Sequence, residues 1–158
     1  KHKGSSLPVE FVDWFQANEY CQKINKRLPT EAEWEKSIRG GTDSKFYWGN
    51  TMDGKFSWFK LNSKGKTHPV GIKLPNMYGI HDMSGNVWEW VSDWYASDYF
   101  QNSLYKNPKG PEAGEFKVQR GGSWSNLADY QSSSYRMVYG PTGKDEFNGF
   151  RCAKSTQP

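Results

Sequence analysis

The sequence has no uninterrupted apolar run of the ~18 residues that a transmembrane helix requires. It also opens without the positively charged, apolar and small-residue sections of a secretory leader. We therefore expect the chain as given to be soluble, with no direct membrane insertion. No run of five like charges occurs either, although 21 Lys and Arg face 17 Asp and Glu. Because these lysines are scattered among carboxylates, no nucleic-acid partner is expected.

Aliphatic residues are scarce, which argues against a Leu-rich helical bundle. Aromatic residues, in contrast, make up 16% of the chain, and 16 glycines accompany them. This composition favours a core of aromatic plates with short strands and long ordered loops. A length of 158 residues favours one domain.

Two segments near the start of the chain carry helix signals. Asp13 and Gln16 have the spacing of a capping box, and apolar residues follow on one helical face, which predicts a helix from about Trp14 to Asn25. Thr30 and Glu33 have the same spacing, and they predict a second helix that ends at residues 40–41, where two glycines stand.

The remainder of the chain shows no helical period. Glycine or proline interrupts it about every ten residues, so short strands and loops are expected. Residues 87–91 and 116–120 alternate as strands do, and residues 97–114 read as an excursion loop. Two early helices followed by a β-rich remainder predict an α+β domain.

No catalytic constellation stands out among the residues. His2, His68 and His81 lack the spacing of a metal triad, and His81 and its neighbour Asp82 would point to opposite faces of an extended segment. The glycines of residues 120–123 lack the lysine and hydroxyl residue of a phosphate-binding loop. No catalytic residue is therefore assigned.

Asp82 and Glu89 flank a Gly85-Asn86 turn. Carboxylates and backbone carbonyls are the ligands that calcium prefers, so a structural calcium site is one interpretation. The other is a turn stabilised by hydrogen bonds of the Asp82 side chain, with Glu89 in solvent. The residues alone leave both open.

Residues 125–147 mix aromatic and small polar side chains without a period of 2 or 3.6. Antibody paratopes have this composition, because Tyr gives contact area at low entropy cost and Ser, Gly and Asn give adaptable hydrogen bonds. We expect a ligand-binding surface here, with an ordinary divergent loop as the alternative. The candidate contacts are Ser125, Asn126, Leu127, Asp129, Tyr130, Ser132, Tyr135, Met137, Tyr139, Thr142, Asp145 and Phe147.

Within this set, some side chains are assigned distinct roles. The aromatic members Tyr130, Tyr135, Tyr139 and Phe147 are expected to be exposed contact anchors. Their polar partners would be Asn126, Asp129, Thr142 and Asp145. Outside the set, the expected core plates and scaffold braces are Trp88, Trp90, Trp124, Arg120 and Arg151.

Three motifs carry a resemblance to a known family. They are Arg-Leu-Pro-Thr-Glu-Ala-Glu-Trp-Glu at residues 27–35, the 78–90 stretch containing Ser-Gly-Asn-Val-Trp-Glu-Trp, and Arg-Gly-Gly-Ser-Trp at 120–124 with Gly-Phe-Arg-Cys at 149–152. In order and spacing they resemble the formylglycine-generating-enzyme (sulfatase-modifying-factor) superfamily, a variant of the C-type lectin fold. The resemblance implies two helices, short antiparallel strands and long ordered loops.

The resemblance also implies a domain organisation. It covers residues 8 to about 153, which predicts a tail at residues 1–7 and one domain over residues 8–158. Members usually carry a further stretch before the first helix, so the chain resembles a truncated or minimal version.

Enzymes of this superfamily oxidise a substrate cysteine with two active-site cysteines that bind copper. Soft Cu(I) selects sulfur ligands, and the two positions are Asn126 and Gln131 here. The resemblance therefore implies no enzyme activity and no copper. It further implies a structural disulfide between Cys21 and Cys152, and a structural Ca²⁺ held by Asp82, Gly85, Val87 and Glu89 with the middle two acting through carbonyls.

The fixed motifs around a mixed segment resemble the variable region of diversity-generating-retroelement target proteins, here residues 120–152. In those bacterial systems asparagine codons of a template are randomised at adenines, and the changed residues gather on one exposed face. This implies a non-enzymatic monomer that binds a protein or glycan ligand and works outside the cytoplasm, at the cell surface or secreted. The alternatives are an oxidoreductase of the superfamily with altered residues, and an accessory surface domain with a static interface.

Overall fold

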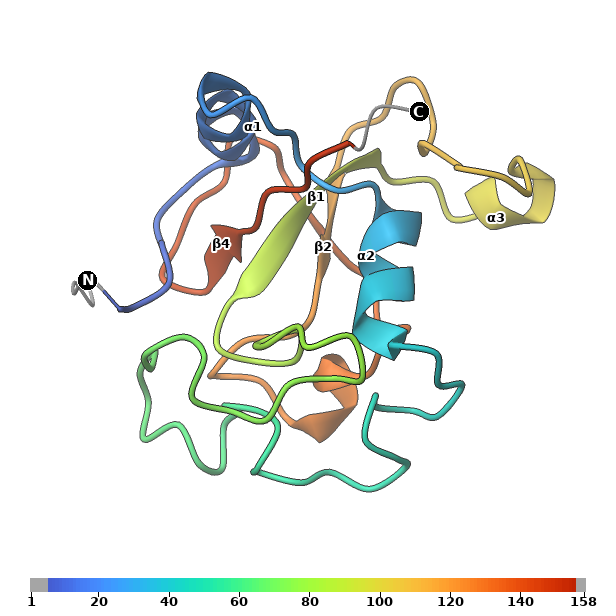
Figure 1. Ribbon diagram of the computed structural model, residues 1–158. Coiled ribbons are helices and arrows are strands. Elements are labelled where there is room, and N and C mark those ends of the chain that lie inside the picture. The colour runs from blue at the N-terminus through green and yellow to red at the C-terminus, as the bar shows by residue number, and fades with distance from the viewer. Residues whose placement is uncertain (1–5, 156–158) are drawn as a thin grey trace.

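A four-stranded sheet in the order β3-β2-β1-β4 runs through the centre of the computed structural model, which describes residues 6–155 (Figure 1). The strands are β1 (Trp88–Trp94), β2 (Lys117–Arg120), β3 (Met137–Tyr139) and β4 (Asn148–Phe150). Residues 1–5 of the predicted tail lie outside the described residues. Among residues 6–155, no helix has both the length and the apolar character needed to cross a membrane.

The sheet is mixed, whereas the motifs implied antiparallel strands. β2 pairs antiparallel with both β1 and β3, but β4 runs parallel to β1. The cause is the path of residues 140–147, which run along the N-terminal segment before β4 begins. There the amides of Phe11 and Trp14 donate to the carbonyls of Asp145 and Pro141, at 2.8 and 3.0 Å. The chain therefore enters β4 in the same direction as β1.

Both predicted helices form, each with the predicted capping box. α1 (Trp14–Lys23) begins after Asp13, and α2 (Glu31–Arg39) begins after Thr30. α2 ends at Gly40, which has a φ of +57° and so adopts the left-handed conformation that favours glycine. Two short helices were not predicted: α3 (Tyr99–Asn102) in the excursion loop and the 3₁₀ helix η1 (Ala128–Gln131).

Successive residues of β1 face opposite sides of the sheet, and one helix covers each side. Trp90 packs with Ala17 and Cys21 of α1. Val91 packs in a second cluster with Trp34 and Ile38 of α2. Residues 41–80 contain no helix or strand, and they form loops at the end of the sheet where η1 also lies (Figure 1).

A disulfide links α1 to the segment after β4. It joins Cys21 and Cys152, which are 131 residues apart in the sequence, with their Cα atoms 5.6 Å apart. In the chain-entropy model, closing a loop of this length stabilises the fold by about 4–5 kcal/mol before strain. The pairing is the one that the family resemblance implied.

Lys117 at the start of β2 is a buried cation that was not predicted. Its side chain is 3% exposed, and its Nζ lies 3.8 Å from the ring centroids of both Trp14 and Trp94. The same Nζ donates to the carbonyl of Ser92 at 2.7 Å. Burial lowers the pKa of Lys117 to about 8, although Asp93 acts in the opposite direction.

This lowered pKa predicts a pH dependence of stability. Between pH 8 and 10.5 the unfolded chain holds a proton on Lys117 that the folded chain has lost, so the free energy of unfolding rises with pH across that window and the gain is absent below it. We expect wild type to gain about 1–3 kcal/mol relative to Lys117→Met between pH 7 and 10. Urea denaturation of both proteins checks this, and parallel pH profiles would contradict it.

Candidate ligand-binding surface

Residues 125–147 are fixed to the scaffold near their midpoint by Arg120, the last residue of β2. Its guanidinium is 0% exposed and donates to the carbonyl of Ser133 at 2.9 Å. It also donates to the carbonyl of Tyr135 and to the carboxylate of Glu35 on α2. Its Nε lies 3.5 Å from the carboxylate of Glu31. The guanidinium therefore holds residues 133–135 against α2.

Arg136 forms a second attachment next to the first. Its Nε and Nη2 donate to the two carboxylate oxygens of Glu31 at 2.7 and 2.8 Å. The aromatic rings of Tyr95 and Phe100 lie 4.9 Å from its guanidinium carbon. Sequence reasoning did not single out Arg136. The signal it left was the pair of acidic residues Glu31 and Glu35, one turn apart on a predicted helix and without an assigned partner.

The two arginines divide the expected binding segment into two parts. We call residues 125–132 the first lobe and residues 137–147 the second lobe. The first lobe contains η1 and lies among the loops of residues 41–80, with the amide of Lys60 donating to the carbonyl of Asn126 at 3.0 Å. The second lobe contains β3 and runs along the N-terminal segment. The sequence had suggested a single continuous patch.

Asn126 and Gln131, at the two positions where the enzymes of the superfamily carry cysteine, both bind Ser123. The Oδ1 of Asn126 accepts from the amide and the hydroxyl of Ser123, at 2.9 and 2.6 Å. The Nε2 of Gln131 donates to the carbonyl of Ser123 at 2.9 Å, and its Oε1 accepts from the hydroxyl of Ser57 at 2.9 Å. The Gln131 side chain is 0% exposed. These carboxamides therefore fasten the first lobe. Asn126 is half-buried, and its role as a ligand contact stays a prediction.

The first lobe exposes fewer of the candidate contacts than expected. Leu127 is 51% exposed, and the Asp129 side chain is 80% exposed while its carboxylate accepts from Lys45 Nζ at 2.6 Å. Ser132 is only 7% exposed, so its prediction as a contact is wrong. It follows directly on η1, where its amide donates to the carbonyl of Asp129 and its neighbours Gln131 and Ser133 are buried.

The four aromatic candidates are half-buried, not exposed as predicted. Each lies against another ring, because burying an aromatic face removes apolar area from water at about 25 cal/mol per Å². The centroid distances run from 4.9 to 6.0 Å for the pairs Tyr130–Tyr135, Tyr135–Trp88, Phe147–Trp124 and Tyr139–Trp90. Each of these rings is therefore partly covered by another ring and partly exposed.

The second lobe is held by its own polar contacts. The Oδ1 of Asp145 accepts from the amide of Phe147 at 2.9 Å. Burial raises the pKa of the Tyr139 hydroxyl, and Asp145 adds to the shift through its charge and a hydrogen bond. Thr142 is exposed, whereas Met137 is half-buried in β3. Trp88 and Trp90 are buried core plates as expected, but Trp124 is only half-buried.

The four residues expected to bind calcium line one pocket of about 540 Å³. Glu89 Oε2 accepts from Arg151 Nε at 2.6 Å and from Trp34 Nε1 at 2.7 Å, and its Oε1 accepts from Arg151 Nη2 at 2.7 Å. A carboxylate has about four acceptor sites, so Oε1 keeps one lone pair for a further ligand. Asp82 Oδ2 accepts from the amide of Gly71 at 2.6 Å, and burial raises the pKa of Asp82.

The oxygen donors of this pocket suit calcium by type, but they are few. Among residues 6–155, no group of three or more His, Cys, Asp or Glu side chains gathers in a way that could hold a metal ion. Calcium at Asp82, Gly85, Val87 and Glu89 therefore depends on backbone carbonyls and stays a prediction. His68 and His81 both have carbonyl partners, Ser63 at 2.7 Å and Lys73 at 2.8 Å.

The sequence and fold resemble several known proteins. The sequence pattern of the sulfatase-modifying factor enzyme 1-like domain matches residues 1–156. The chain is 39% identical to serine/threonine-protein kinase pkn1 of Chlamydia caviae over 95% of this chain and 24% of that protein. It is 37% identical to the formylglycine-generating enzyme of Mus musculus over 98% of this chain and 46% of that protein. The chain thus spans less than half the length of these two relatives.

Among solved structures, variable protein 1 of Treponema denticola superposes with a TM-score of 0.83 at 31% identity, covering 94% of this chain and 71% of that one. This likeness, with the match to the domain pattern, confirms the α+β fold of the formylglycine-generating-enzyme and C-type lectin type. The relatives include both an enzyme and a protein described as variable. Similarity alone does not choose between those two activities.

Gln131 and Asp129 both belong to η1, but substitution of each by alanine should change stability by different amounts. Gln131→Ala leaves the buried Ser57 hydroxyl without a partner and removes one of the two donors to the Ser123 carbonyl, so we expect a loss of about 2–3 kcal/mol in the free energy of unfolding. Asp129→Ala, two residues away, removes only an exposed ion pair and should change it by less than about 0.5 kcal/mol. Denaturant titration measures both. Equal losses would mean that Gln131 does not fasten the lobe.

The calcium prediction is tested by thermal unfolding. With millimolar CaCl₂ we expect Tm to rise by about 2–5 °C, because a ligand that binds only the folded chain stabilises it. MgCl₂ should have little effect. Asp82→Asn should remove the rise, and asparagine suits this position because Asp82 has a φ of +57°. Asp43→Asn, on an exposed loop, is the control. The same rise in all three proteins would argue against this pocket.

Proposed function

The chain belongs to the sulfatase-modifying factor enzyme 1-like family, and from this premise we propose that it is a non-enzymatic ligand-binding protein. In this proposal it displays a diversified surface, of the kind made by diversity-generating retroelements, on a C-type lectin-type scaffold. The ligand is a protein or a glycan. The likeness to a Treponema denticola protein named as variable supports this reading.

One observation carries the proposal: both positions of the family's catalytic cysteines hold carboxamides that are engaged within the scaffold. Asn126 accepts a hydrogen bond from the amide of Ser123, and Gln131 donates one to the carbonyl of Ser123. A carboxamide offers no thiolate for Cu(I) and cannot form a mixed disulfide with a substrate cysteine. The only two cysteines of the chain are paired with each other. An oxidoreductase of the same superfamily is the alternative, and it would need other residues for its chemistry.

The separation of scaffold from surface supports diversification. Residues 133–136 are held by the buried Arg120 and the half-buried Arg136, whereas Leu127, Asp129 and Thr142 stand in solvent. Substitutions at such exposed positions usually change stability by less than about 0.5 kcal/mol. A surface built in this way can change its chemistry while the fold is kept. We infer that diversification acts on the two lobes and spares residues 133–136.

We further propose that the domain works as a monomer outside the cytoplasm of a bacterium, at the cell surface or in secreted form. The disulfide between Cys21 and Cys152 supports this location, because disulfides persist in oxidising compartments and are rare in the cytosol. An accessory surface domain with a static interface would share the location. It would differ in keeping one sequence at the two lobes.

The coding locus provides the decisive test of diversification. We expect a near-copy of codons 120–150 that differs only at adenines, next to a reverse-transcriptase gene. Codons 78–90 serve as the internal control, since they should have no such copy. Sibling sequences should differ at residues 125, 127, 129 and 142 and agree at Arg120 and Gln131. A locus without the near-copy, with siblings invariant in both lobes, would favour the static interface.

The enzymatic alternative is tested on the purified protein. We expect no bound copper or iron by elemental analysis after incubation with each metal, and no oxygen consumption with a thiol-containing peptide. Formylglycine-generating enzyme assayed in parallel serves as the positive control. Stoichiometric copper with turnover would overturn the proposal.

A further inference from the structure

We call residues 120–152 the variable segment. A lysine-bearing loop outside this segment lies against the first lobe. It comprises residues 60–66, and we call it the lysine loop. Lys60, Lys64 and Lys66 are all exposed. The loop turns at Lys64 and Gly65, whose φ angles are +54° and +70°, and the amide of Gly65 donates to the hydroxyl of Ser63 at 3.3 Å. A lysine with positive φ is uncommon, so the surrounding contacts hold this turn in a fixed shape.

Hydrogen bonds to main-chain carbonyls of the variable segment join the lysine loop to it. The amide of Lys60 donates to the carbonyl of Asn126 at 3.0 Å. The hydroxyl of Ser63 donates to the carbonyl of Trp124 at 2.8 Å. These bonds use main-chain carbonyls of the variable segment, so they persist when the side chains of that segment change. The lysines therefore keep the same place beside the lobe in every variant.

The described part of the chain offers the lysine loop no carboxylate at ion-pair distance. Across residues 6–155, none of Lys60, Lys64 and Lys66 makes a salt bridge. Lys45, on the other side of the first lobe, differs in this respect because it pairs with Asp129 at 2.6 Å. The lysine loop thus presents three uncompensated positive charges at the margin of the first lobe.

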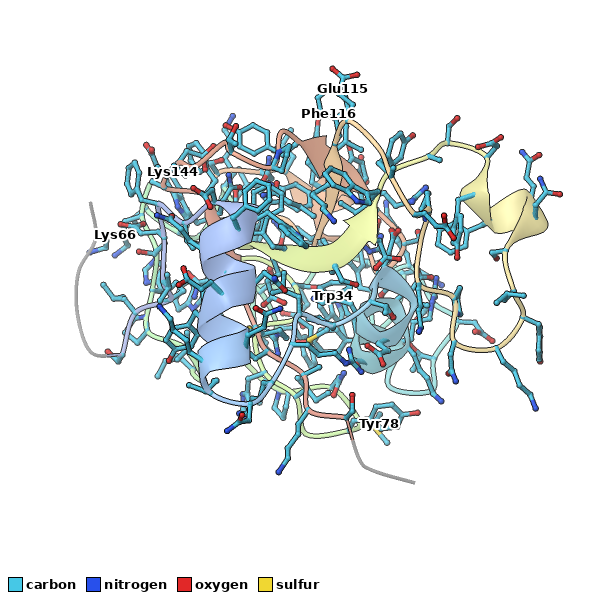
Figure 2. The ribbon with its side chains drawn as sticks, turned by 90° about the horizontal axis from the view of Figure 1, so that it is seen from above. Trp34, Lys66, Tyr78, Glu115, Phe116 and Lys144 are labelled. Carbon is cyan, nitrogen blue, oxygen red and sulfur yellow. A yellow bond between two sulfur atoms is a disulfide. The ribbon has the colours of Figure 1, made fainter. Side chains whose placement is uncertain are left out.

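A further lysine, paired with a carboxylate, lies beyond Trp124. The Trp124 ring lies 5.0 Å from that of Phe147, and its Nε1 donates to the carbonyl of Glu146 at 3.3 Å. Lys144, two residues before Glu146, is 47% exposed and lies 3.7 Å from the carboxylate of Asp13. Lys66 and Lys144 are labelled on the same side of the molecule in Figure 2.

We propose that the lysine loop is a constant part of the binding surface and restricts its ligands to acidic protein surfaces. This inference rests on the proposed function. Diversified residues then select among partners, while Lys60, Lys64 and Lys66 attract acidic ones and raise their association rate. A protein partner is favoured over a glycan because the lobe combines the exposed Leu127 with tyrosine edges, a composition typical of protein-binding paratopes.

The test uses a fluorescently labelled peptide of about 20 glutamates as the probe, with binding followed by anisotropy at about 0.15 M salt, where the Debye length is about 8 Å. We expect Lys64→Glu/Lys66→Glu to raise the Kd at least about tenfold. The control Lys106→Glu/Lys109→Glu makes the same change in net charge at two exposed positions near α3, far from the lysine loop (Figure 1). It should raise the Kd less than about twofold, because surface charges beyond a Debye length are screened.

Several outcomes would overturn the inference. They are no binding of the peptide to wild type, equal losses in the two charge-reversed variants, or tighter binding of heparin or of phosphatidylserine vesicles that depends on Lys64 and Lys66. Tighter binding of heparin would assign the surface to a sulfated glycan, and tighter binding of the vesicles would assign it to a membrane. Circular dichroism should show both variants folded. A near-copy of codons 120–150 found together with any of these results would leave the proposed function standing and remove only the acidic preference.

Discussion

The buried guanidinium of Arg120 is the interaction on which the arrangement of this domain depends. It sits at the end of β2, it is closed off from solvent, and it holds α2 and residues 133–135 together. Burial lowers the pKa of Arg120, and the charges of Glu31 and Glu35 oppose that shift. Taking a cation out of water is costly, so such a group adds less to stability than to geometry. Its contribution here is to fix the path of residues 133–135 against α2.

This constraint explains how one segment can serve both scaffold and surface. Arg120 fixes the middle of residues 125–147. The carboxamides of Asn126 and Gln131 fix the beginning, and contacts with the N-terminal segment fix the end. Between these points the side chains are free to differ. Aromatic candidates turned one face to the scaffold because the core has few aliphatic residues to fill it. The surface is therefore smaller than the segment that carries it.

Local signals in the sequence predicted the helices well. The capping boxes at Asp13 and Thr30 involve partners three residues away, so pattern reading finds them. The motifs also indicated the fold family and the pairing of Cys21 with Cys152. Long-range features escaped: the parallel pairing of β4 and the position of Lys117 between two tryptophans. Each depends on residues distant in sequence, about which composition and period carry no information.

The bond between Cys21 and Cys152 has a consequence for the fate of the protein in a protease-rich environment. It encloses nearly all of the chain, including the excursion loop of residues 97–114, where surface hydrolysis would occur most readily. A single cut between the two cysteines leaves both fragments covalently attached. A cut in this loop therefore does not let the two parts of the domain separate.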